Sequence, residues 1–235
     1  RLVGVTEVDA AYTTVGSALG VLRLWDGPFS GIHDFQLATG ADTTVLLIDR
    51  TGDDTSGLSY SLEKSVDETA VAKMATDNKF YSVCDIKTTD SMYTMSHEVG
   101  HQMGAGHSNL NTTGGYSNPQ TTDYSFGYHF QDKNANRYRT VMGYVSAGGE
   151  KWSAAPYFST PDITPDEYGV AIGTETNDNR RVLLQTCKGA SEWREHVLPY
   201  DWDVRFLDDN GDDIPSATYT HDSNITVGGA TPLSC

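Results

Sequence analysis

Apolar and polar positions alternate along the first part of the chain in a way that predicts a mixed α/β fold. Leu2 to Val8 alternates apolar residues in a β-branched context, and Thr43 to Asp49 is an apolar run that ends in a turn cluster. Both patterns favour strands, because successive side chains of a strand point to opposite faces. Two shorter strands are predicted at residues 57–62 and 79–86, and two helices at residues 14–25 and 66–77.

A further helix is predicted just before the middle of the chain. Asp90 is a favourable N-cap, and Ser91 to Val99 contains no Gly or Pro, so this segment can form helical turns. Residues 108–172 are rich in Asn, Thr, Ser, Gly and Pro, which predicts long loops with few regular elements. Gly173 to Cys187 predicts a last helix, and the composition becomes acidic and aromatic from about residue 190.

The charge of the chain restricts its partners. The 235 residues include 16 Lys and Arg against 32 Asp and Glu, which is a formal net charge of -16. This surplus repels phosphate backbones and anionic lipids, so neither nucleic acid nor a membrane is expected as a partner. No apolar run approaches the roughly 18 residues that a membrane helix needs. Since the sequence begins at Arg1 and not at Met, we expect a leader or pro-segment to have been removed.

The most informative stretch runs from His97 to His107 and satisfies every fixed position of the pattern H-E-x-x-H-x-x-G-x-x-H. Residues four apart lie on one helix face, so His97 and His101 can direct their imidazoles at one metal ion. Gly104 can turn the backbone through a conformation closed to other residues and so return His107 as a third ligand. Three neutral nitrogens leave a tetrahedral zinc ion one open position for water, as in a catalytic site.

The chemistry expected from this motif is metal-assisted amide hydrolysis. Glu98 is rotated by about 100° from His97 on the helix, so it can take a proton from a zinc-bound water as general base and pass it to the leaving amine. Histidines at coincidental spacing are the alternative, which requires five specified positions to agree by chance. The remaining histidines lack ligand spacing and are expected to be solvated or locally bonded: His33, His129, His196 and His221.

A second motif, Arg139 to Tyr144, follows the first at a characteristic distance. Met142 lies 35 residues after His107, where the metzincin zinc peptidases carry the Met-turn, a tight loop with a Met beneath the zinc. Tyr144 stands two residues later, a spacing that resembles astacins and serralysins, in which this Tyr binds the metal at rest and then stabilises the oxyanion. A Met and a Tyr that are simply packed in the core are the alternative for both positions.

With both motifs, the chain resembles the metzincins, and among them the reprolysin-like bacterial peptidyl-Asp metallopeptidases. The likeness runs from about Leu2 to Cys187, and besides the two motifs it includes Gly40-Ala41-Asp42, Gly57-Leu58-Ser59-Tyr60, Cys84 and Tyr157-Phe158-Ser159-Thr160-Pro161. One departure is Ser108, which follows the third histidine where these relatives carry Asp and which is more typical of matrixins. The other is that the strand and backing helix that open the family fold are not apparent before Leu2.

The resemblance implies an α/β (α+β) fold of the metzincin type in residues 1–189. An upper subdomain, residues 1–107, would hold a twisted mixed sheet and the active-site helix. A lower irregular subdomain, residues 108–189, would hold the Met-turn and a C-terminal helix, followed by an extension of unassigned role at residues 190–235. Because a sheet without its backing helix exposes an apolar face, we expect either a bound N-terminal fragment or pro-segment, or an incomplete chain.

The resemblance also implies roles for single residues. It assigns zinc binding to His97, His101 and His107, the general base to Glu98, support of the site to Met142 and oxyanion stabilisation to Tyr144. It pairs Cys84 with Cys187 in a disulfide, and Cys187 with Cys235 is the rival pairing.

The expected preference for an acidic residue just after the scissile bond needs a cation in the substrate pocket. Arg137, Arg139 and Lys151 flank the Met-turn and are the candidates, with solvated loop cations as the alternative.

The predicted function is that of a secreted zinc endopeptidase acting on extracellular proteins or peptides. The acidic surplus serves solubility or, as a further hypothesis, binds calcium at Asp208 to Asp213 or near Asp53 and Asp54. The alternative function is a zinc-binding module that has lost catalysis and serves in adhesion or partner binding. The presence of Glu98 favours the enzyme.

Overall fold

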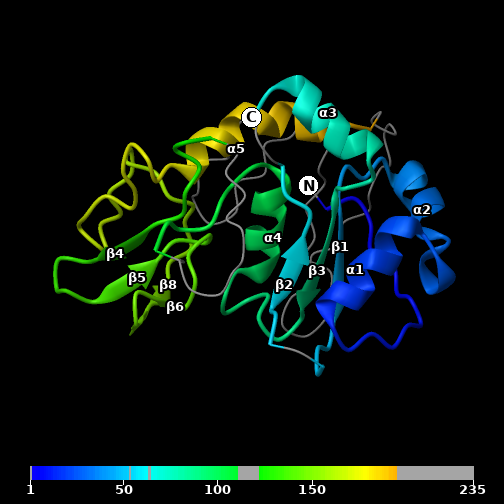
Figure 1. The fold of residues 1–235 in the computed structure, drawn as a ribbon, viewed down its shortest axis with the longest axis horizontal. Coiled ribbons are helices and arrows are strands. Elements are labelled where there is room, and N and C mark those ends of the chain that lie inside the picture. Colours follow the sequence, from blue (N-terminus) through cyan, green and yellow to red (C-terminus); the bar gives the residue numbers. More distant parts are fainter. Residues whose placement is uncertain (1, 53, 63–64, 111–121, 195–235) are drawn as a thin grey trace, which may run out of the picture. The chain divides into compact units, whose positions relative to one another are not determined.

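A three-stranded mixed sheet forms the centre of the first half of the chain (Figure 1). The computed structural model describes residues 2–52, 54–62, 65–110 and 122–194. The strand order is β1 (Thr44–Ile48), β3 (Tyr81–Asp85), β2 (Gly57–Ser59), with β1 parallel and β2 antiparallel to β3. These are the strands predicted from the sequence, with shorter ends. The central strand β3 is buried along its whole length, and β2 is an edge strand.

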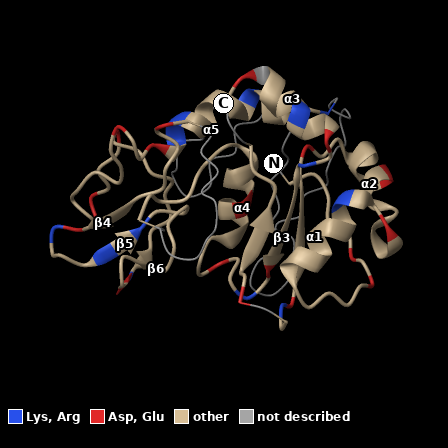
Figure 2. Cartoon of the chain, viewed as in Figure 1, with Lys and Arg blue, Asp and Glu red and all other residues tan. Residues whose placement is uncertain are grey.

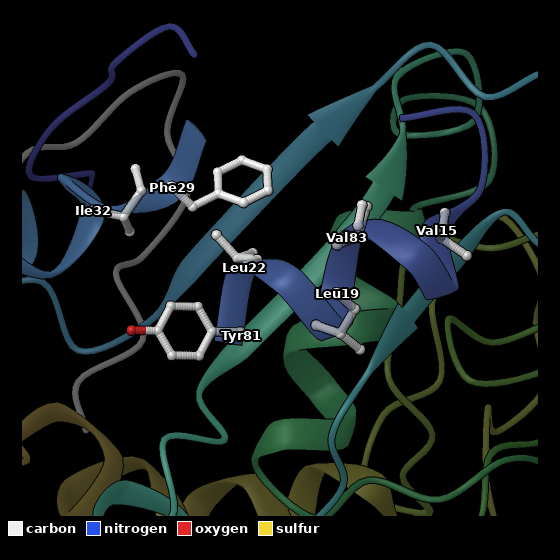
Figure 3. Packing of buried hydrophobic residues seen from close by; sticks show 8 residues of the cluster. Val15, Leu19, Leu22, Phe29, Ile32, Tyr81 and Val83 are labelled. Atoms are coloured by element: carbon white, nitrogen blue, oxygen red, sulfur yellow. The ribbon is translucent and has the colours of Figure 1, made fainter. Parts of the chain in front are cut away.

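Helix α1 (Val15–Leu24) covers one face of this sheet, and a short 3-10 turn, η1 (Gly27–Phe29), and α2 (Ile32–Thr39) follow it. The apolar side chains between α1 and the sheet form one cluster (Figure 3), which contains Val15, Leu19, Leu22, Phe29, Ile32, Tyr81 and Val83. The helix predicted over residues 14–25 is therefore confirmed, and a helix of the chain itself backs this face of the sheet.

The strand predicted over Leu2 to Val8 is wrong. None of these residues pairs with another strand, and the exposed fractions of Leu2 and Val5 are 79% and 78%. Alternation indicates which face a strand would bury, but a strand forms only where a neighbouring strand accepts its hydrogen bonds. No described strand does so for this segment.

Helix α4 (Thr94–Gln102) lies on the opposite face of the sheet from α1. Tyr81 and Val83 of β3 face α1, so the alternate residue Cys84 points the other way, and its thiol lies close enough to Glu98 of α4 for that carboxylate to raise the pKa of the thiol. The predicted start of this helix, with Asp90 as N-cap, is wrong. The residues after β3 form turns, and the helix begins only after Tyr93, which is left-handed with φ 57°.

Residues 122–178 contain only short strands, as the loop-rich composition predicts. They are β4 (His129–Gln131), β5 (Arg137–Arg139), β6 (Ser146–Ala147), β7 (Glu150–Lys151) and β8 (Ser153–Ala154). Strands β4, β5 and β8 form one small sheet, and β6 and β7 form a hairpin. The last helix, α5 (Asn179–Ser191), begins later than predicted, after the capping residue Asp178, and packs against α3 (Glu68–Thr76). The small sheets and helices fit a metzincin-like fold, while the division of the chain at residue 189 stays a prediction.

The disulfide predicted between Cys84 and Cys187 is not formed. Cys84 is a free thiol that is completely buried in β3 and directed at α4. Burial is the main cause that raises the pKa of this thiol, which therefore stays protonated. The rival pairing involves Cys235, which lies outside the described residues. None of the described helices has the length and apolar character needed to cross a membrane.

Candidate metal centre

The three histidines of the sequence motif converge on one point. The Nε2 atoms of His101 and His107 are 2.9 Å apart, and those of His97 and His107 are 3.1 Å apart. Two of these side chains come from α4, and Gly104, with φ 91°, turns the backbone so that His107 returns, as predicted. Among the described residues, these three form the group of His, Cys, Asp and Glu side chains that could hold a metal ion.

Backbone carbonyls determine which nitrogen of each helical imidazole carries the proton. His97 Nδ1 donates to the carbonyl oxygen of Val141 at 2.8 Å, and His101 Nδ1 donates to that of Ala105 at 2.9 Å. Since a carbonyl oxygen only accepts, both protons lie on Nδ1, and both Nε2 lone pairs point toward His107. Lone pairs directed at one point suit a bound cation, and three imidazoles are a donor set that suits zinc.

Burial keeps these imidazoles neutral. It lowers the pKa of His97 to about 4 and that of His107 to about 3, and it lowers the pKa of His101 well below its usual range. The positive charge that a neighbouring histidine would carry adds to this effect for His101 and His107. All three side chains are therefore neutral near pH 7, which is the protonation state of a metal ligand.

Glu98 lies beside the histidines and is nearly buried, with 5% of its surface exposed. It faces the edge strand β2 so closely that a Cβ atom added to Gly57 would lie 2.5 Å from Glu98 Oε1. Burial raises the pKa of Glu98 to about 8, and the neighbouring hydroxyl of Ser59 opposes this rise. A carboxyl group with a pKa near neutrality can both take and return a proton.

The predicted Met-turn lies directly against the metal-binding helix. The amide of Gly143 donates to the carbonyl of Thr140 at 2.9 Å, which closes the turn. Met142 is completely buried, and its Sδ would lie 3.0 Å from a Cβ atom at Gly100 of α4. The turn also provides the carbonyl of Val141 that orients His97. The structure thus brings Met142 to the position that the resemblance implies.

Tyr144 also reaches the site. Its hydroxyl is 3.3 Å from each ring nitrogen of His107, and the centroids of the two rings are 4.6 Å apart. The phenol therefore lies beside the third histidine of the motif. Its role toward an oxyanion stays a prediction.

A cleft of about 610 Å³ contains the site. Its lining includes the edge strand β2, the three histidines, Glu98, Tyr144 and Arg139. Of the three candidate cations, only Arg139 lines this cleft. Arg137 and Lys151 are exposed outside it, and Arg137 forms an ion pair with Glu150 at 3.1 Å. Figure 2 shows basic residues on β5 and on other elements, among them α3 and α5.

The guanidinium of Arg139 is buried, with 2% of the residue exposed. One of its nitrogens donates to the carbonyl of Gly143 at 3.0 Å, and its Nε has no hydrogen-bond partner among the described residues. Burial lowers the pKa of Arg139 from its usual value, because the charge has little solvent around it. No carboxylate of the described residues forms an ion pair with it.

The prediction that His129 is solvated or locally bonded is wrong, and this residue lies next to the site. His129 is 6% exposed, and its ring lies between Ser108 Oγ at 2.8 Å and the carbonyl of Tyr144 at 3.0 Å. Its partners lie 21 and 15 residues away along the chain, so no local spacing could have indicated them.

Calcium is not supported. Asp54 is exposed and pairs with Arg50 at 4.0 Å. The other acidic candidates, Asp53 and Asp208 to Asp213, lie outside the described residues.

The converging imidazoles, the buried glutamate beside them and the Met-turn beneath the helix together define a metallopeptidase site of the metzincin-like class. Comparison with known proteins agrees. The model of metallo-peptidase family M12 matches residues 2–159, and the chain belongs to this family. The predicted reprolysin-like metallopeptidase family is thus confirmed.

A relative of known class is the peptidyl-Asp metalloendopeptidase of Stenotrophomonas maltophilia (strain R551-3). It is 32% identical over 166 residues, which cover 68% of this chain and 34% of the relative. The chain therefore spans about a third of the length of this relative. A solved chain described as "Structure of a chaperone-substrate complex" has a TM-score of 0.49 and 21% identity, and the match covers 79% of this chain and 25% of that one.

Proposed function

We propose that this chain is a zinc-dependent endopeptidase that cleaves extended segments of proteins and favours bonds followed by an acidic residue. The observation that carries the proposal is the convergence of three neutral imidazoles next to a buried carboxyl group, inside a cleft bordered by an edge strand. Family M12 and the relative named peptidyl-Asp metalloendopeptidase support it. A location outside the cell and the removal of a pro-segment stay predictions from the sequence.

The edge strand β2 provides the binding surface for the substrate backbone. One side of β2 pairs with β3, and the strand also lines the cleft beside His97 and Glu98. An extended peptide can add to such an edge through main-chain hydrogen bonds, and this places a peptide carbonyl along the cleft independently of sequence. Gly57 and Ser59 of β2 are small residues, and Gly57 lies directly against the carboxyl group of Glu98.

Zinc, when bound by the three histidines, supplies an acidified water and polarises the scissile carbonyl. Glu98 would accept a proton from the attacking water and deliver it to the leaving amine, a role that its burial beside the histidines supports. The hydroxyl of Tyr144, beside His107, donates a hydrogen bond to the oxygen on which negative charge develops. The burial of Glu98 excludes bulk water from the proton transfer.

Arg139 supports the proposed preference for an acidic residue. A buried guanidinium without a carboxylate partner among the described residues lacks compensation for its charge. A substrate carboxylate that enters the cleft would provide this compensation through charge-assisted hydrogen bonds.

The reaction is tested with the variant Glu98→Gln, which keeps the size of the side chain and removes the base. Wild-type protein and the variant are loaded with zinc and incubated with unfolded casein, with and without a chelator, and the fragments are sequenced by mass spectrometry. We expect chelator-sensitive cleavage by the wild type and no turnover by the variant, which should still bind zinc. A folded, zinc-loaded wild type that cuts nothing would support the inactive binding module, and full activity of the variant would exclude Glu98 as base.

The preference is tested with Arg139→Gln. Charge-assisted hydrogen bonds contribute roughly 1.5–3 kcal/mol, so the ratio of cleavage before Asp to cleavage before Asn should fall by about tenfold to a hundredfold. Arg137→Gln is the matched control, because Arg137 is exposed and lies outside the cleft lining. An unchanged ratio in Arg139→Gln would mean that another group recognises the acid.

A further inference from the structure

We propose that Ser108 and His129 form a hydrogen-bonded bridge that positions the third metal ligand, His107, relative to Tyr144. The kinetic part of this inference rests on the proposed peptidase function, and the metal-affinity part does not. The bridge joins three segments that lie far apart along the chain: the residue after the third histidine, strand β4 and the residue that follows the Met-turn.

For a neutral imidazole, the geometry of His129 allows one arrangement of protons. Nε2 of His129 is 3.0 Å from the carbonyl oxygen of Tyr144, which only accepts, so this nitrogen carries the ring proton. Nδ1 then accepts a hydrogen bond from the hydroxyl of Ser108 at 2.8 Å. Both ring nitrogens are thereby used.

The ring has little room to move. It belongs to a residue of β4 that pairs with Arg139 of β5, and Trp152 packs edge-on against it at 4.9 Å between centroids. A Cβ atom at Gly143 would lie 3.2 Å from Cε1 of His129, so the backbone of the Met-turn touches the ring as well. The bridge is therefore held from the strand, from the turn and from an aromatic face.

The bridge positions His107, the histidine of the motif that does not lie on α4. His97 and His101 are positioned by the helix, whereas His107 depends on the chain after Gly104. Ser108 anchors that chain twice, because its amide donates to the carbonyl of Met142 at 3.1 Å and its hydroxyl donates to His129. Across the bridge, the hydroxyl of Tyr144 lies 3.3 Å from the ring of His107. His129 therefore acts as a positioning residue, through Ser108 on one side and Tyr144 on the other.

The test replaces His129 by Phe, which keeps an aromatic ring and removes both hydrogen bonds. Loss of a group that orients a metal ligand typically lowers metal affinity or activity 10- to 100-fold, so we expect the zinc dissociation constant, measured by competition with a chromogenic chelator, to rise at least about tenfold. In the casein assay kcat should fall about tenfold with KM changed less than about twofold, since substrate contacts are retained.

Two further variants separate positioning from general damage. His129→Gln can still donate to the carbonyl of Tyr144 and should recover part of the zinc affinity and of kcat. His33→Phe is the matched control, because His33 is a half-buried histidine stacked on Trp25 at 4.1 Å, outside the cleft lining, and it should leave zinc affinity unchanged. In a Tyr144→Phe background the effect of His129→Phe on kcat should shrink, because part of it acts through Tyr144.

The outcomes are distinguishable. Wild-type zinc affinity in His129→Phe overturns the inference whatever the activity is. Fully additive losses of kcat in the double variant overturn the part that acts through Tyr144. A wild-type protein that binds zinc but cleaves nothing refutes the proposed function, and the zinc measurement still decides the inference. If His129→Phe does not fold, Ser108→Ala, which removes only the hydroxyl, carries the same zinc test with the same expected direction.

Discussion

The closeness of Gly57 to Glu98 allows a sharp test of how the general base is placed. In Gly57→Ala, the new Cβ atom would lie 2.5 Å from Glu98 Oε1, 2.7 Å from Thr94 Cγ2 and 2.8 Å from Glu98 Cγ. Ordinary contact begins near 3.4 Å, so the carboxylate has to retreat by about 0.9 Å. A misplacement of about 1 Å at a reacting group can cost about a hundredfold in rate, which corresponds to about 2.7 kcal/mol in the activation barrier.

The assay is kcat/KM for a casein-derived peptide, together with zinc affinity. We expect Gly57→Ala to lose about a hundredfold in kcat/KM and to keep its zinc affinity, because the atoms nearest to the new methyl group belong to Glu98 and Thr94 and not to the ligands. Gly20→Ala in α1 is the matched control, since nothing lies within 4 Å of that position, and it should stabilise the helix by about 1 kcal/mol without changing activity. Wild-type kcat/KM in Gly57→Ala would refute the argument that close packing against β2 places the base.

Two further predictions concern stability. Removing zinc with a chelator should lower the melting temperature by roughly 5–10 °C relative to protein with free zinc at about 100 times the dissociation constant. At that zinc concentration, binding stabilises the folded state by about 2.7 kcal/mol. An unchanged melting temperature would contradict a zinc site in the folded state. Burial alone would raise the pKa of Asp85, but hydrogen bonds from the amide of Lys87 and from Arg50 at 3.2 Å lower it below its ordinary value. A group whose pKa is lowered by folding stabilises the protein at pH values above its unfolded pKa, here about 3.9, and this contribution is lost as the pH falls through the folded pKa. The free energy of unfolding from urea titrations should therefore decline below about pH 4. Asp85→Asn should flatten that decline.

The convergence of the three histidines could be predicted from the sequence because their geometry is local. Two of the three histidines lie one helical turn apart, and the third returns through a glycine whose positive φ the spacing already required. The predicted start of α4 is wrong because it depends on the path of the chain after β3 and not on local residue type. Asp90 is a favourable capping residue, but it lies within the turns that follow β3.

Burial of charged side chains could not be predicted from position alone. Arg137 and Arg139 lie two apart on β5 and should share a face, yet the first is exposed and the second is buried in the cleft. Arg139 pairs with β4 and β8, whereas Arg137 pairs with β4 alone at the open end of the sheet. That difference arises from the register of a distant strand, which no local pattern specifies.

The same reason explains why the contacts of His129 could not be predicted from the sequence. An isolated histidine is usually solvated or locally bonded, and its partners at this site lie on segments that only the folded chain brings together. The departure at Ser108 was visible in the sequence, but its significance depends on the imidazole opposite it.

The edge strand along the cleft has a consequence for what such a site can digest. A peptide that adds to β2 must itself be extended and free of its own partners, whereas folded proteins keep most of their backbone in helices and paired strands. A segment whose local opening costs about 4 kcal/mol is accessible in about one molecule in a thousand. If the chain acts as proposed, the rate of digestion would follow how often a target opens, so that denatured chains would be cleaved much faster than folded ones, including other copies of the same protein.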